Sequence, residues 1–329
     1  MPEHRQADAV FQGGGVKGIA LVGALLAFAE EGWDEWVSVA GTSAGSIVAG
    51  FLACGFSPHD LEGILRKTPY KRFEDFGRGG EFVGGAINLT MHHGLAHGEE
   101  FHKWFDKMIE GKTFGDVTAG GKTLKMIAAD ITQKEMLVLP DDLVQYNDPR
   151  TGKPIVPDDW KIADAVRMSM SIPFFFQPVE LVHAKSGMKS VIVDGGMLSN
   201  FPVWLFDVAD KDPTRPTFGF RLYGGKSLTP GGIHTVLQRF AWPAAFGFDM
   251  FQTTTEAWDK RFMSHSTRVR TCAISAVGVG TVDFDLKEAD QTKLLESGKK
   301  AGHDFLADFH PEEYFNTFGR TLAPAAVPA

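Results

Sequence analysis

The pentapeptide GTSAG at residues 41–45 lies between two apolar runs and restricts the fold more than any other segment. The apolar residues before it predict a strand and those after it a helix, so Ser43 stands at a sharp strand-to-helix turn. Gly41 and Gly45 remove Cβ atoms that would clash in so tight a turn. The free N–H groups at the start of a helix favour negative charge beside it. The segment therefore predicts an α/β fold that presents Ser43 as a nucleophile.

The composition is that of an ordinary globular chain and argues against several classes of partner. Of its 329 residues, 43% are hydrophobic and 22% are charged, and the formal net charge is −8. Domains that bind nucleic acid are normally basic, so we expect no nucleic-acid partner. The chain has two cysteines, Cys54 and Cys272, and no disulfide framework is expected.

The sequence predicts neither a leader nor a membrane span. Residues 1–8 are polar and lack the apolar core of a signal peptide, and no uncharged apolar run reaches the roughly 18 residues of a spanning helix. We therefore expect a cytoplasmic protein. An effector exported by a route that needs no such leader would have the same features, so that alternative stays open.

Strand and helix patterns alternate at the start of the chain. Residues 7–12 and 36–40 predict strands, and residues 19–31 and 44–54 predict helices. This order is typical of parallel strands with helical connections, and we expect a three-layer α/β/α fold with a central, mainly parallel sheet. Further strands are expected at residues 123–130, 135–139, 179–183, 190–194, 217–222 and 267–274, and further helices at 161–170, 234–261 and 287–308.

No repeat and no linker divides the chain, and we expect a single domain over residues 1–329. Residues 57–115, which include a glycine-rich break, are expected to form a cap over one face. Residues 206–315 are expected to extend the same domain. The tail 320–329, rich in alanine and proline, is expected to be disordered.

A second glycine-rich segment, GGGVKG at residues 13–18, follows the first predicted strand directly. It fits the Gly-x-Gly-x-x-Gly pattern of dinucleotide-binding folds, which also requires an acidic residue at the end of the second strand. Here the second strand ends in apolar residues and leads into Ser43, which argues against a nucleotide. Adjacent parallel strands end side by side. The N–H groups of Gly14 and Gly15 are therefore expected to form an oxyanion hole beside the serine.

A nucleophilic serine needs a base, and the candidate is Asp194. It ends the apolar run 191–193 and is followed by Gly195 and Gly196, which allow a sharp turn. An aspartate at the start of a turn is also common as a purely structural cap. Taken one at a time, the residues leave both roles open.

Together, three motifs resemble those of the patatin-like phospholipase family in order and spacing: GGGVKG at 13–18, GTSAG at 41–45 and DGG at 194–196. The segment RMSMSIP at residues 167–173 also resembles that family. The likeness covers residues 8–205 and continues more loosely to the closing helix. One departure is Lys17, where arginine is common in the family. Because backbone N–H groups would make the oxyanion hole, we expect this change to be tolerated.

The resemblance implies a lipid acyl hydrolase of the phospholipase A or lysophospholipase type. Ser43 would attack the ester carbonyl, and Asp194 would take its proton directly and later activate water, with a pKa raised by burial. The substrate would be a phospholipid or another acyl-ester lipid, met by peripheral membrane contact, and neither a metal nor an organic cofactor is implied. The assigned residues are this catalytic pair, the oxyanion-hole glycines Gly13, Gly14 and Gly15, and the supporting motif residues Lys17, Gly18, Gly41, Gly45, Gly195 and Gly196.

Two other functions stay open on the sequence. A lipid-binding or membrane-associated scaffold without catalysis would use the same fold, although the intact Ser43, Asp194 and glycine loop favour an enzyme. An α/β-hydrolase would need a histidine after the acid, and the chain offers four, none in a glycine-rich turn at a strand end: His234, His265, His303 and His310. A second group of histidines lacks the carboxylates of a metal-site pattern, so no metal is expected there: His92, His93, His97 and His102.

Aromatic residues indicate where an acyl chain would lie. Phe174–Phe176 precede the strand of Asp194 and could line an acyl-chain groove or pack in the core. The stretch 240–262 contains seven aromatic residues and could meet a lipid interface. Its few lysines and arginines favour core packing instead.

Overall fold

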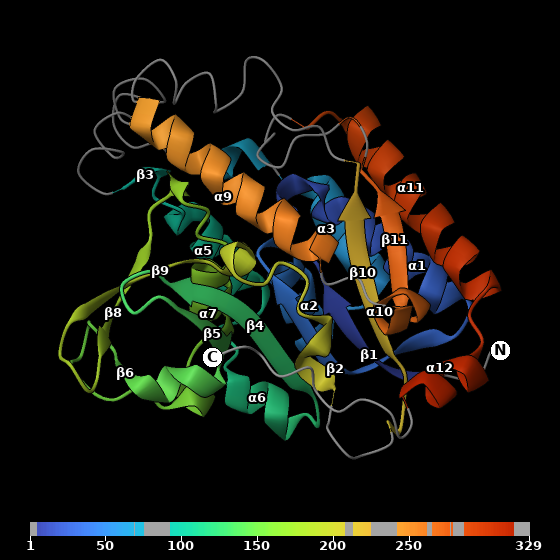
Figure 1. Cartoon of the computed structure of the whole chain (residues 1–329), viewed down its shortest axis with the longest axis horizontal. Helices are drawn as coiled ribbons and strands as arrows, with labels where there is room; N and C mark the ends of the chain where they lie inside the picture. Colours follow the sequence, from blue (N-terminus) through green and yellow to red (C-terminus); the bar gives the residue numbers. More distant parts are fainter. Residues whose placement is uncertain are drawn as a thin grey trace.

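The centre of the molecule is a mixed β-sheet. The structure, a computed structural model, describes residues 5–68, 70–75, 93–207, 213–224, 242–261, 265–276, 278 and 286–318. Within them, a nine-stranded sheet has the order β11-β10-β1-β2-β4-β9-β8-β6, with β5 paired to β4 (Figure 1). Its strands are β1 (Arg5–Phe11), β2 (Trp33–Thr42), β4 (Thr123–Asp130), β5 (Glu135–Leu139), β6 (Tyr146–Asn147), β8 (Val179–His183), β9 (Lys189–Asp194), β10 (Thr217–Tyr223) and β11 (Thr271–Ser275). A separate pair is formed by β3 (Gly94–Ala96) and β7 (Phe174–Phe176).

The sheet is parallel in one half and antiparallel in the other. β11, β10, β1, β2 and β4 run parallel to one another, whereas the pairs that involve β5, β6, β8 and β9 are antiparallel. Parallel strands between two covering layers are buried on both faces, and residues 7–11 of β1 are all buried. The expected α/β sheet flanked by helices is confirmed, and the strands predicted at 179–183 and 190–194 form an antiparallel pair, β8 and β9.

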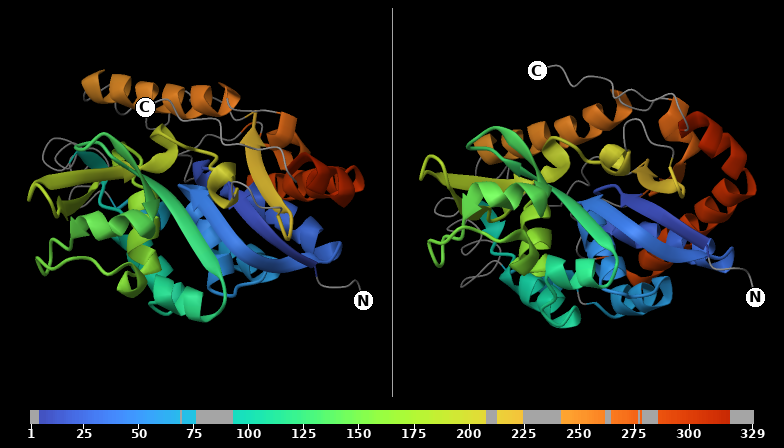
Figure 2. Two further views of the ribbon diagram at one scale, coloured as in Figure 1. Left: turned by 60° about the horizontal axis from the view of Figure 1, so that its bottom comes forward. Right: turned by 90° about the horizontal axis from the view of Figure 1, so that it is seen from below.

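One face of the sheet carries a layer of helices. Phe220, Phe11 and Met126 occupy one in-register row across the strands. Phe28, in the helix Ile19–Glu30, packs on Phe220, and Gly50, in the helix Ala44–Ala53, lies over Met126. Both helices therefore cover the same face of the sheet. The layer consists of α1 (Ile19–Glu30), α2 (Ala44–Ala53), α7 (Ile162–Ser169) and α11 (Glu288–Ala307) (Figures 1 and 2).

The C-terminal part of the chain belongs to this same layer. α11 crosses α1 closely because glycines lie at the crossing: a Cβ added to Gly298 would lie 1.9 Å from the carbonyl oxygen of Ala20. Phe305 of α11 stacks on Phe28 of α1, with ring centroids 5.8 Å apart. On the opposite face of the sheet, the chain that follows β9 packs Phe201 and its neighbours on β1 and β2.

The segment expected to form a cap contributes to the helical layer as well. Its described parts, residues 57–68, 70–75 and 93–115, contain α3 (Pro58–Lys67) and α5 (Glu99–Met108). Phe105 of α5 packs on Phe51 of α2 with ring centroids 4.7 Å apart. The glycine-rich break lies outside the described residues, as does the tail 320–329.

A long helix, α9 (Trp242–Arg261), lies across the turn that follows β9 (Figure 2). A Cβ added to Gly196 in that turn would lie 3.2 Å from Cγ2 of Thr255 in α9. Residues 234–241 of the predicted helix lie outside the described residues. No helix in the described part of the chain has the length and apolarity needed to cross a membrane.

One predicted strand is wrong in its first half. Residues 267–274 have the β-branched composition of a strand. In the structure α10 (His265–Val269) comes first, and β11 begins at Thr271. The Thr271 hydroxyl donates to the carbonyl oxygen of Thr267, four residues back, which closes a helical turn. The remaining helices, α6 (Phe114–Ala119) and α12 (Pro311–Phe318), were not predicted from the sequence.

Candidate active site

Ser43 stands at the turn between β2 and α2, as the sequence predicts. Its backbone angles are φ 54° and ψ −126°, a conformation that is strained for a residue with a side chain. The glycines on either side are required by close backbone contacts. A Cβ on Gly41 would lie 2.2 Å from the carbonyl oxygen of Gly45, and a Cβ on Gly45 would lie 2.2 Å from that of Phe11. The turn places the serine at the N-terminus of α2, where the helix dipole favours negative charge.

β2 and β9 end head to head on one edge of β4, and β5 fills the other edge. Thr42 of β2 is paired with Ile127, and Asp194 of β9 is paired with Ala128. Ser43 follows Thr42 directly. Two consecutive positions of β4 therefore bring the serine and the aspartate together from distant parts of the chain.

The Ser43 hydroxyl faces the Asp194 carboxylate closely enough to lower its pKa. The N–H of Gly196 donates to Oδ1 of the same carboxylate at 2.8 Å. Among the described residues, no histidine acts on this carboxylate. Burial raises the pKa of Asp194 to about 7, although the Ser43 hydroxyl and the Gly196 N–H lower it. A carboxylate with this pKa can accept a proton near neutral pH.

The segment Ser169–Ser171, at the end of α7, contacts both Ser43 and Asp194. The hydroxyl of Ser169 accepts the Ser43 N–H at 3.0 Å and donates to the Ile127 carbonyl at 2.7 Å. Two residues on, the carbonyl of Ser171 accepts the Asp194 N–H at 2.9 Å. The sequence predicts no role for Ser169 or Ser171, because nothing in the segment 167–173 distinguishes them from other polar residues near the end of a helix.

The glycine loop lies directly against Ser43. A Cβ on Gly13 would lie 3.1 Å from Cβ of Ser43 and 2.2 Å from Oδ1 of Asn200. The Gly13 N–H donates to the Asn200 carbonyl at 3.1 Å, so it is already used. Within the described residues, the N–H groups of Gly14 and Gly15 have no hydrogen-bond acceptor. The oxyanion-hole assignment of Gly13, Gly14 and Gly15 stays a prediction, and of the three N–H groups that of Gly13 is bound to Asn200.

The remaining motif glycines act through close packing. A Cβ on Gly195 would lie 2.3 Å from the Ile127 carbonyl oxygen, and one on Gly18 would lie 3.3 Å from Cβ of Ala44. Lys17 is half-buried in the loop. These positions hold the loop, the serine turn and the aspartate turn in contact.

The pair is covered in this structure. Ser43 is 6% exposed and Asp194 is 1% exposed, and α9 lies over the aspartate turn. Of the phenylalanine triplet, Phe175 and Phe176 are buried in the core, whereas Phe174 has φ 67° and places its ring against Gly247 of α9. Core packing therefore accounts for two of the three rings.

The aromatic stretch 240–262 divides between core and surface. Phe248 and Phe251 are buried, and Phe246 is half exposed. The side chains of Trp242 and Trp258 are outside what the structure describes, as are residues 240 and 262.

Two histidines of the 92–102 group, His97 and His102, have partners away from the serine. Nε2 of His102 lies 2.7 Å from Oδ1 of Asp164, and Nδ1 of His97 lies 2.7 Å from Nε2 of Gln177. In the part of the chain that the structure describes, no group of three or more His, Cys, Asp or Glu residues is arranged to hold a metal ion. His92 and His234 lie outside that part.

Known proteins resemble this chain in sequence and in fold. A family model described as "Patatin-like phospholipase" matches residues 9–207. The uncharacterized protein YqhO of Bacillus subtilis (strain 168) is 34% identical over 307 residues, which cover 91% of this chain and 97% of that protein. The uncharacterized protein R571 of Acanthamoeba polyphaga mimivirus is 26% identical over 211 residues, 62% of this chain and 63% of that one. The structure of VipD from Legionella pneumophila shares the fold with a TM-score of 0.54 at 16% identity, covering 97% of this chain and 70% of VipD.

Proposed function

The chain belongs to the patatin-like phospholipase family, and from this premise we propose that it hydrolyses carboxylic esters of lipids with Ser43 as nucleophile and Asp194 as base. Family membership implies a lipid acyl hydrolase. The observation that carries the finer assignment is the pairing of β2 and β9 with β4, which brings the serine hydroxyl against a buried aspartate. A scaffold without catalysis has no need of that arrangement, or of a strained serine.

In the proposed reaction, Oγ of Ser43 attacks the ester carbonyl carbon while Asp194 takes the hydroxyl proton. The carbonyl oxygen becomes an oxyanion, which the N–H groups of Gly14 and Gly15 and the N-terminus of α2 stabilise. When the tetrahedral intermediate collapses, Asp194 returns the proton to the departing alcohol, and the acyl group stays on the serine. Each such donor is typically worth about 3–4 kcal/mol of barrier.

Deacylation repeats these steps with water. Asp194 takes a proton from a water molecule, and the resulting hydroxide attacks the acyl carbon. The second intermediate collapses to release the fatty acid, and Ser43 recovers its proton from the aspartate. All of these steps use groups that the chain itself supplies, so the proposed reaction needs no metal and no organic cofactor.

The test is release of fatty acid from mixed phosphatidylcholine and phosphatidylglycerol vesicles with a chelator present. We expect the purified chain to release fatty acid at the same rate with and without the chelator. A strict need for added metal would contradict this mechanism. Lipid binding without turnover of either vesicles or a short-chain ester would favour the scaffold.

The rate is also expected to depend on pH in a way that the pKa of Asp194 sets. Burial raises that pKa to about 7, and the base works only when ionised. We therefore expect kcat/KM for a short-chain nitrophenyl ester to rise as the pH rises through about 7 and to level off above it. An aspartate of ordinary pKa would place this rise near pH ~4, so a profile already flat between pH ~5 and ~8 would contradict the assignment.

A further inference from the structure

Arg167 of α7 is a buried cation whose hydrogen bonds all go to neutral groups, while the Asp75 and Glu99 carboxylates act on it at longer range. It is 9% exposed, and its guanidinium donates to Oγ of Ser171 at 2.5 Å, to the carbonyl of His97 at 2.6 Å and to that of Gln177 at 2.7 Å. Within the described residues, no carboxylate lies within ion-pair distance of it. Burial lowers the pKa of Arg167 to about 10, which leaves it charged at neutral pH. Since burying a charge is unfavourable, such a position calls for a reason.

On the side of the candidate active site, Arg167 holds the segment Ser169–Ser171 through its hydrogen bonds with Ser171. The Ser171 hydroxyl accepts from Arg167 Nη1 and donates back to the Arg167 carbonyl at 2.7 Å, so its position is defined twice. The Ser171 carbonyl in turn accepts the backbone N–H of Asp194. The hydroxyl of Ser169, which lies between Arg167 and Ser171 in the sequence, accepts the N–H of Ser43. One guanidinium is thus one hydrogen bond away from the segment that contacts both proposed catalytic residues.

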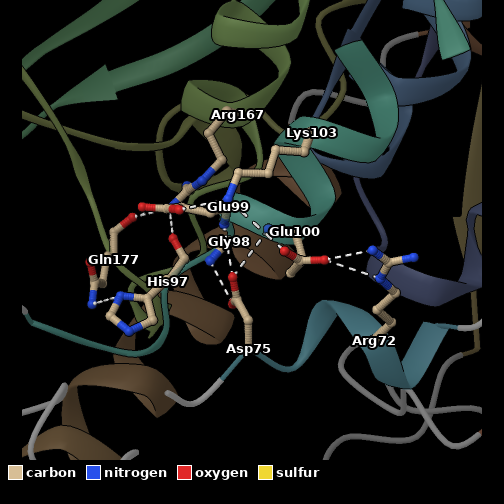
Figure 3. A network of polar contacts seen from close by, with 9 residues as sticks. All are labelled: Arg72, Asp75, His97, Gly98, Glu99, Glu100, Lys103, Arg167 and Gln177. Carbon is tan, nitrogen blue, oxygen red and sulfur yellow. Dashed lines mark hydrogen bonds and ion pairs between the residues drawn. The ribbon is translucent and has the colours of Figure 1, made fainter. Parts of the chain in front are cut away.

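Toward the outer helices, Arg167 lies against the start of α5. Figure 3 shows its guanidinium beside His97 and Gly98, where α5 begins. A Cβ on Gly98 would lie 2.6 Å from Nε of Arg167, so the helix start is fitted closely to the arginine. The carboxylate of Asp75 accepts the N–H groups of Gly98, Glu99 and Glu100 at 2.7, 2.9 and 3.2 Å and closes this end of the helix.

We propose that Arg167 is a positioning residue for the hydrolysis: through Ser171 it sets the spacing between Ser43 and Asp194, and through His97 it makes that spacing depend on where α5 begins. This proposal rests on the proposed function. Arg167 does not touch the serine or the aspartate, and it acts by holding the backbone that does. Misplacement of reacting groups by about 1 Å can lower a rate by about 100-fold, so a positioning residue can have a large effect.

The experiment compares Arg167→Met and Ser171→Ala with Arg270→Met as the matched control. Arg270, directly before β11, is also a buried arginine, 3% exposed, and it lies over the ring of Phe318. Its guanidinium pairs with the carboxylate of Asp207 and has no contact with Ser43 or Asp194. Ser171→Ala removes one hydroxyl and serves if Arg167→Met fails to fold. The measurements are kcat, KM and the pH profile with a nitrophenyl ester, together with hydrogen exchange at the backbone amides of Ser43 and Asp194.

For both test variants we expect kcat to fall about 10- to 100-fold with KM changed less than about 2-fold. The midpoint of the pH profile is expected to move upward, because a displaced Asp194 loses the contacts that lower its pKa. The amides of Ser43 and Asp194 are expected to exchange faster, and Arg270→Met is expected to change none of these.

Three results would overturn the proposal. Folded Arg167→Met and Ser171→Ala proteins could keep the wild-type kcat and pH profile, Arg270→Met could lower kcat as much as they do, or both amides could stay protected in the test variants. Failure of the proposed function is distinguished from these, because it would leave the wild type without turnover while hydrogen exchange still reports on the positioning.

Discussion

Alanine in place of Ser43 is expected to lower fatty-acid release from phospholipid vesicles by at least about 1,000-fold, to the background rate. The substitution removes the atom that would form the acyl-enzyme, and among the described residues no second nucleophilic side chain acts on Asp194. The fold is expected to survive, because the backbone N–H that binds Ser169 remains and the side chain only shrinks. Release of fatty acid, measured by titration, checks this.

The matched control for this variant is Ser190→Ala. Ser190 is also a fully buried serine, at the start of β9, and its hydroxyl has no hydrogen-bond partner in the structure. We expect it to keep wild-type activity and stability. If Ser43→Ala retained a substantial share of the wild-type rate at an unchanged melting temperature, Ser43 would not be the nucleophile.

Asparagine in place of Asp194 is expected to lower kcat by about 1,000-fold or more while the protein stays folded. The amide has nearly the same shape but cannot accept the serine proton. The melting temperature gives a second check, because the substitution is expected to lower kcat without lowering the stability of the folded state. The folded-state pKa of Asp194 is raised from 3.8 to about 7, so its ionisation destabilises the folded state increasingly as the pH rises through that interval. Above pH ~7, Asp194→Asn is therefore expected to melt at a temperature equal to or higher than the wild type.

Asp130→Asn supplies the control. Asp130 is 1% exposed at the end of the neighbouring strand β4, and its carboxylate accepts from Tyr146 and from two backbone N–H groups. It does not contact Ser43, and we expect its loss to lower the melting temperature with kcat unchanged at assay temperature. Equal losses of kcat in the two asparagine variants would show that a buried carboxylate matters only for the fold.

The elements of the candidate site could be predicted from sequence, but their meeting point could not. Local chemistry dictates the serine turn, since Gly41 and Gly45 are needed where backbone atoms approach within 2.2 Å of an added Cβ. The contact between Ser43 and Asp194 depends instead on which residues of β4 each strand pairs with, and that register is a tertiary property.

Residues that act through others were the hardest to recognise. Arg167 and Ser169 lie on an amphipathic helix, and hydrophobic periodicity does not distinguish a polar residue that binds a neighbouring segment from one that faces water. Gly13 was expected to be an oxyanion donor like its neighbours, because sequence cannot show that the Asn200 carbonyl already binds its N–H. The residues 267–269 read as strand because β-branched residues favour strands until tertiary contacts decide otherwise.

The head-to-head ends of β2 and β9 on β4 also determine when the chain can begin to act. During synthesis the serine turn is made early, but its base arrives only with residue 194, and the two meet only after β9 has paired with β4. A slip of one residue in that pairing would send the carboxylate to the other side of the sheet. On the proposed function, partly made or misregistered chains lack a working pair, because Asp194 reaches Ser43 only after β9 has paired with β4 in the right register.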